Sequence, residues 1–210
     1  MMKKIRSIST FVLLFVMVLG TLTLLPSAKV RAANPYLPLW DHMPDGEPRK
    51  FEDPDNPGKY RIYVYGSHDT RRNDYCGLDL RAWSAPEEDL SDWRDEGSIF
   101  TYHIDGKWDV MFAPDIAEIV KKDGTKEYYL YPHSRADQRP NYRVPMVCKG
   151  DSPVGPFEPI NLNEAGTAVV DGSPLGFDPG VWVEEITDIN DPDYDTGYRA
   201  YAYWGNAWEG

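Results

Sequence analysis

Three stretches of this chain repeat one order of residues: a proline beside an aspartate, which we predict to open a strand, and then an aromatic strand that ends in a turn. The pairs are Pro44-Asp45, Pro114-Asp115 and Asp178-Pro179, and the strands read YRIYVYGSHD, KEYYLYPHS and YRAYAYWGN. A sheet unit repeated at this spacing is typical of a β-propeller. If the first strand of each unit lies nearest the axis, the three aspartates converge on one central funnel, where carboxylates can act together in acid/base chemistry.

The rest of the chain also favours an all-β fold. Apolar residues alternate at period two in RIYVY and GVWVEEI, and Lys122-Asp123-Gly124 predicts a hairpin turn. The repeated units are expected at residues 45–100, 112–160 and 177 onward. Blades of about 40 to 50 residues allow about three blades here, and a closed ring needs about four. We therefore expect an incomplete copy of a longer propeller domain.

The first 33 residues have the three parts of a secretory signal peptide. A basic head with Lys3, Lys4 and Arg6 precedes an apolar run, and Val30-Arg31-Ala32 forms a small-residue cleavage site. The competing interpretation is a single uncleaved membrane anchor. The sequence thus predicts a secreted protein whose mature domain covers residues 34–210.

The mature chain is strongly acidic. The leader holds five of the 22 basic residues and none of the 34 acidic residues, so the formal charge changes from −12 to −17 on cleavage. This excess argues against nucleic acid, and after cleavage against an anionic membrane, as a partner. The 7 Trp and 14 Tyr offer flat faces that can cover sugar rings, although burial in a β core is the usual place for such side chains.

The two cysteines, Cys76 and Cys148, fall in separate predicted units, which favours two buried free thiols over a disulfide. No metal-ligand spacing surrounds them or the four histidines, so the sequence predicts no metal site and no cofactor. The segments EDPDNPGK and TDINDPDYDTG are interpreted as hairpin loops and not as calcium sites.

The order of the motifs resembles glycoside hydrolase family 43. The resemblance rests on HMPDGEPRKF before a YVYG strand, WSAPEEDLSDW, FAPDI, YYLY, SPVGPF, and GFDPGVWV before YAYWG, and it covers residues 34–210. It implies a five-bladed propeller and a hydrolase that acts on arabinan, arabinoxylan or related glycans. An axial calcium occurs in part of this family, with a ligand expected from outside this chain.

The resemblance also assigns roles to individual residues. It implies that Asp45 is the general base, although Gly46 stands where the family usually has proline, and Asp41 in LPLWDHMPD is the rival. Asp178 in GFDPGVW matches the aspartate that adjusts the pKa of the acid and orients the sugar. Asp115 and Phe112 are expected to line the sugar pocket. The structural alternatives are that Asp115 is a carboxylate in the turn that opens a strand and that Phe112 is a core aromatic.

The family's third residue is a glutamate that protonates the departing oxygen. Glu209-Gly210 matches the start of the acidic-residue, Gly, Pro motif of this glutamate, but it follows Asp178 too closely in the sequence. The acid is therefore expected outside this chain, and the fragment is expected to be inactive alone. Inversion needs an ionised base and a protonated acid on opposite faces of the ring. A third carboxylate beside the acid raises its pKa by like-charge repulsion.

Two other functions are compatible with the same repeats. One is a propeller that binds glycans through aromatic platforms without cleaving them. The other is an adhesion propeller in which the Asp-Pro units only start strands, which predicts aspartates that lie far apart. The sequence leaves open the choice between arabinose and xylose, and between exo and endo action.

Overall fold

The computed structural model describes residues 37–38, 40–70, 77–104, 107–108, 110–134, 146–164 and 178–205. Every helix or strand element among these residues is a β-strand, and the sheets are antiparallel. The all-β prediction is therefore confirmed for this part of the chain. The same residues include no helix with the length and apolarity needed to cross a bilayer.

The first sheet is a four-stranded meander. Its strands, each paired with the next, are β1 (Glu47–Glu52), β2 (Tyr60–Ser67), β3 (Asp79–Pro86) and β4 (Arg94–Thr101). The aromatic run YRIYVYGS forms β2 and is buried over most of its length. The strand pairs with β1 and β3 on its two edges, and Tyr63 and Tyr65 pack into the hydrophobic core. This sheet agrees with the predicted unit at residues 45–100.

The second sheet repeats this order of strands. It consists of β7 (Met111–Val120), β8 (Lys126–Ser134), β9 (Cys148–Gly150) and β10 (Glu158–Pro159). The predicted turn at residues 122–124 joins β7 to β8, and Gly124 adopts a left-handed conformation there with φ of 85°. The sheet agrees with the predicted unit at residues 112–160.

A third sheet follows as a hairpin of β11 (Gly180–Glu185) and β12 (Tyr198–Tyr203). The short strands β5 (His103–Ile104) and β6 (Lys107–Trp108) pair between the first and second sheets in the sequence. The start of the third predicted unit at Phe177 lies outside the described residues.

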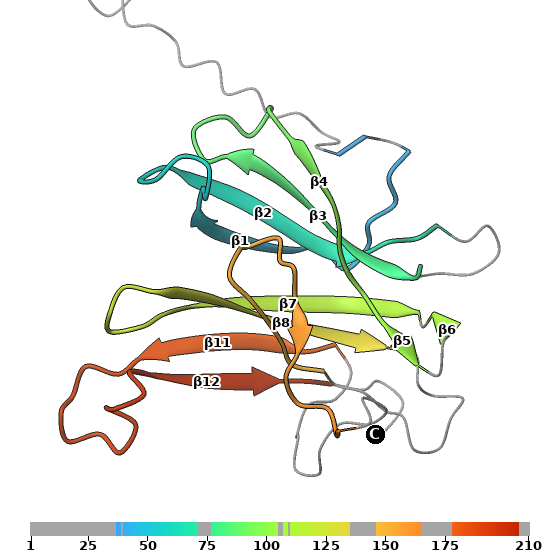
Figure 1. Ribbon diagram of the computed structural model, residues 1–210. Helices are drawn as coiled ribbons and strands as arrows, with labels where there is room; N and C mark the ends of the chain where they lie inside the picture. Colours follow the sequence, from blue (N-terminus) through green and yellow to red (C-terminus); the bar gives the residue numbers. More distant parts are fainter. Residues whose placement is uncertain are drawn as a thin grey trace, which may run out of the picture. The chain divides into compact units, whose positions relative to one another are not determined.

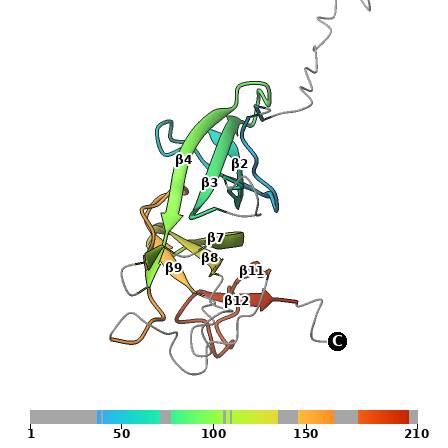
Figure 2. The ribbon, with the colours of Figure 1, turned by 90° about the vertical axis from the view of Figure 1, so that its right-hand side faces the viewer.

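The second sheet, with β7 and β8, lies between the first sheet and the hairpin of β11 and β12 (Figure 1 and Figure 2). Successive residues of β7 point to opposite faces, so Ile116 packs into the core shared with the first sheet, while Ala117 packs beside Val181 of β11. In β8, Leu130 and Tyr131 divide between the two cores in the same way. The middle sheet is thus buried on both faces.

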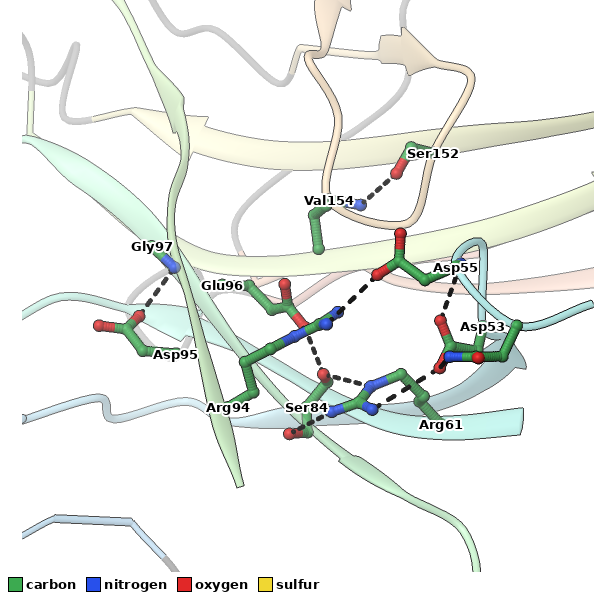
Figure 3. A network of polar contacts seen from close by, with 11 residues as sticks. Asp53, Asp55, Arg61, Ser84, Arg94, Asp95, Glu96, Gly97, Ser152 and Val154 are labelled. Atoms are coloured by element: carbon green, nitrogen blue, oxygen red, sulfur yellow. Dashed lines mark hydrogen bonds and ion pairs between the residues drawn. The ribbon is translucent and has the colours of Figure 1, made fainter. Parts of the chain in front are cut away.

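The first sheet also carries a network of polar contacts (Figure 3). The buried Arg61 donates from Nε to Ser84 Oγ at 2.8 Å and from Nη2 to the Ser84 carbonyl oxygen at 3.1 Å. Ser84 in turn donates to Glu96, which also accepts from Arg94 Nε at 2.9 Å. The charge of Arg61 is matched by the buried carboxylate of Asp53, just after β1, at 3.7 Å between Nη1 and Oδ2.

Several sequence predictions fall outside the described residues. These are the signal peptide at 1–33, Cys76, and the Glu209-Gly210 pair. Cys148 is described and is a buried free thiol, as predicted. Burial raises its pKa well above the usual value for a thiol.

Candidate active site

The loop before β1 is fastened to the end of β2. The backbone N–H of Asp69 donates to the His42 carbonyl oxygen at 2.8 Å. The buried carboxylate of Asp41 accepts from Trp83 Nε1 at 2.5 Å, forms an ion pair with Arg81 Nε at 3.6 Å, and lies 3.4 Å from His68 Nε2. His68 Nδ1 also contacts Asp79 Oδ1 at 2.8 Å. Through these buried contacts, Asp41 holds the loop before β1 against β3.

Asp45 lies at the other end of this loop and is exposed. Its backbone is left-handed, with φ of 57°, a conformation that aspartate tolerates better than most residues. Ser67 Oγ at the end of β2 donates to Asp45 Oδ2 at 2.9 Å. The Asp45 carboxylate is therefore exposed and oriented, so it can reach a bound molecule, whereas Asp41 is buried against Trp83. The predicted role of Asp45 as the base stays a prediction.

Asp178 stands two residues before β11, as Asp45 stands two residues before β1. It too is exposed and left-handed, with φ of 47°. Partial burial raises the pKa of Asp178, and the charge of Asp45 raises it further. These two carboxylates, which precede strands of different sheets, therefore lie close enough for their charges to repel each other.

The equivalent position in the second sheet holds an alanine. Among the described residues, Asp45, Ala113 and Asp178 are the non-glycine residues with positive φ, and Ala113 precedes Pro114 as Asp178 precedes Pro179. Ala113 lies at a register shift in β7. The prediction that Asp115 opens its strand is wrong, because Asp115 lies inside β7, beyond this irregularity.

Asp115 is 1% exposed and joins three strands. It accepts from Arg49 Nη2 of β1 at 2.6 Å, from its neighbour Ile116 N at 2.6 Å, and from Val181 N of β11. Burial raises the pKa of Asp115, while the amide of Val181 and the charge of Arg49 favour its ionised form. Its predicted place in the sugar pocket stays a prediction, and the contacts favour a role in joining the sheets.

Phe112 is 6% exposed, and its ring centroid lies 5.8 Å from that of His133 on β8. This tilted packing and the burial are typical of a core aromatic. Its predicted role as a stacking surface for sugar stays a prediction.

The Asp-rich segment between β11 and β12 is a hairpin loop, as predicted. Arg199 Nη2 donates to Asp191 Oδ1 at 2.7 Å and Arg199 Nε donates to Asp193 Oδ2 at 2.8 Å. Within the part of the chain that the structure describes, no three or more His, Cys, Asp or Glu side chains are grouped so as to hold a metal ion.

Gly66 lets the Asp45 loop approach β2, and replacing it should displace this loop. A Cβ at Gly66 would lie 2.7 Å from the Pro44 carbonyl oxygen and 2.7 Å from Met43 Cγ, both closer than real Cβ contacts. If Asp45 acts in catalysis, Gly66→Ala should lower kcat of the full-length protein by about 10-fold to 100-fold, since small misplacements are costly. Initial rates on a chromogenic glycoside would measure this.

The matched control is Gly205→Ala, because a Cβ there meets no atom within 4 Å. We expect wild-type rates for that variant. A Gly66→Ala protein with wild-type kcat and KM would show that the loop does not position a catalytic group.

Comparison with known proteins gives one informative similarity. The chain is 37% identical to a xylosidase/arabinosidase of Thermoclostridium stercorarium over 179 residues, which cover 82% of this chain and 32% of that protein. The chain therefore spans less than half the length of this relative. No protein-family profile and no solved structure matches the chain.

Proposed function

We propose that this chain contributes two catalytic carboxylates to an inverting glycosidase that acts on xylose- or arabinose-containing glycans. The observation that carries the proposal is the electrostatic contact between Asp45 and Asp178, two exposed carboxylates on equivalent left-handed residues of different sheets. Its substrate class is supported by the similarity to a xylosidase/arabinosidase. The sheets are blades of a family 43 propeller, which has five blades when complete.

In the proposed mechanism, Asp45 is the general base. Its ionised carboxylate takes a proton from the water that attacks the anomeric carbon, while Ser67 fixes one of its oxygens. Asp178 lies across the sugar, orients it, and raises the pKa of the acid by like-charge repulsion. The acid is a glutamate from a later blade, which protonates the departing oxygen. The leader directs the protein out of the cell, where such polysaccharides occur.

The stereochemistry of the product tests this function. The full-length protein is incubated with aryl α-L-arabinofuranoside, aryl β-D-xyloside and arabinoxylan, and the first product is followed by ¹H NMR. An inverting mechanism gives the sugar of opposite anomeric configuration before mutarotation. A product of retained configuration, or no release from any of the three substrates, would contradict the proposal. Glycan binding without release would instead favour the non-catalytic binding propeller.

A further inference from the structure

The end of β2 contains a buried serine that contacts two of the three left-handed residues. Ser67 is 0% exposed. Its Oγ donates to Asp45 Oδ2 at 2.9 Å and accepts from the backbone N–H of Ala113 at 2.9 Å. Ser67 therefore joins the loop before β1 to the irregular segment of β7 in the second sheet.

These two contacts fix the direction of the serine proton. A hydroxyl has one proton to donate, and the N–H of Ala113 can only donate to its oxygen. The proton must then find an acceptor, and the Asp45 carboxylate is the acceptor in place. A hydrogen bond to a carboxylate favours the ionised form, which a general base needs.

The backbone of β7 supplies the donor through an irregular conformation. Ala113 has φ of 21°, which is sparsely populated for a residue with a side chain, and it lies at the register shift of β7. Irregularities of this kind are common beside functional sites, where they change the direction in which a side chain or backbone group points. Here the re-aimed group is an N–H that faces Ser67.

We infer that Ser67 is a positioning residue, which sets the orientation of the Asp45 carboxylate and is itself held by the Ala113 N–H of the second sheet. This inference rests on the proposed function of Asp45 as the base. Ser67 does not act on the sugar directly, because its side chain is fully buried. The inference also explains why position 113 can be alanine where the other two units have aspartate, since the second unit contributes a backbone N–H and not a carboxylate.

Charged groups among the described residues lie near Asp45 or Ser67, in the sequence or by their interactions. Asp178, from the segment before β11, is the group whose pKa responds to Asp45. His68, next to Ser67, faces Asp41 and Asp79. On β1, Arg49 faces Glu47 and Asp115. A change at Ser67 therefore leaves the ion pairs of His68 and Arg49 in place.

The test compares Ser67→Ala with Ser84→Ala in the full-length protein. Ser84 is also fully buried in the first sheet, but it bonds Arg61 and Glu96 in the network of Figure 3. Both variants lose a buried hydroxyl, so both are expected to lose some stability. Only Ser67→Ala should lower kcat, by about 10-fold, and move the acidic limb of the pH–rate profile up by about one unit, with KM little changed. A conservative Ser67→Thr variant that keeps activity near wild type would support the role of the hydroxyl.

A second readout does not depend on turnover. In crystal structures of the two variants, the Asp45 carboxylate is expected to change its orientation in Ser67→Ala and to keep the wild-type orientation in Ser84→Ala. An unchanged carboxylate in Ser67→Ala, or an equal change in both variants, would overturn the inference. A changed carboxylate in a protein without glycosidase activity would instead overturn the proposed function and leave the positioning role in place.

Discussion

Replacing Asp45 by asparagine is expected to lower kcat of the full-length protein by about 10²–10⁴-fold, the usual contribution of a general base. Asparagine keeps the size of the side chain and can still accept from Ser67, but it cannot take a proton from water. Binding of the glycan should therefore survive. Initial rates on a chromogenic glycoside and calorimetric titration with an oligosaccharide measure the two effects separately.

The control for this variant is Asp92→Asn, which changes an exposed carboxylate in the turn before β4 and should leave kcat at the wild-type value. Asp41→Asn is the informative rival. Asp41 is buried against Trp83 and His68, so its loss should act mainly on stability. Loss of turnover in Asp41→Asn with full activity in Asp45→Asn would move the base to Asp41 and contradict our assignment.

Replacing Asp115 by alanine is expected to destabilise the folded protein by about 3 kcal/mol, the lower end for breaking a buried ion pair. The change leaves the Val181 amide without its carboxylate acceptor and removes the partner of Arg49 across the sheets. We expect the lower end because the Arg49 side chain keeps 27% exposure and can be solvated. Urea unfolding followed by tryptophan fluorescence measures the free energy of unfolding.

An exposed ion pair at the first sheet provides the comparison. Lys50 and Glu87 form a contact in which both side chains are 47% exposed. Glu87→Ala should therefore change the free energy of unfolding by less than about 1 kcal/mol. If Asp115→Ala were as mild as Glu87→Ala, Asp115 would not join the sheets, and its predicted place in the sugar pocket would become the better account.

The sheets could be predicted because they depend on local patterns. Alternation in RIYVY and the turn at Lys122 to Gly124 directly predict β2 and the hairpin of β7 and β8. The repeated order of strands then follows, since neighbouring strands joined by short turns pair with each other. The exposed positions of Asp45 and Asp178 before their strands agree with the same pattern.

The second unit was harder to predict because its strand contains an irregularity. The proline of FAPDI matches the proline of FDPG, so Ala113 and Asp178, which precede these prolines, are equivalent. The Pro-Asp pattern instead pointed to Asp115, which follows Pro114. The residue before a proline is usually extended, with a negative φ, so this rule does not predict the positive φ of Ala113. Ser67 could not be predicted, since its contact with Ala113 joins segments 46 residues apart through the packing of two sheets.

The most direct test of the account is a crystal structure of the full-length Asp178→Asn variant with an arabino- or xylo-oligosaccharide bound. We predict one sugar ring between residues 45 and 178, with a water held by Asp45 on the face of the ring opposite the departing oxygen. A saturating oligosaccharide that leaves this space empty, or a ring whose anomeric carbon is out of reach of any water on Asp45, would contradict the account.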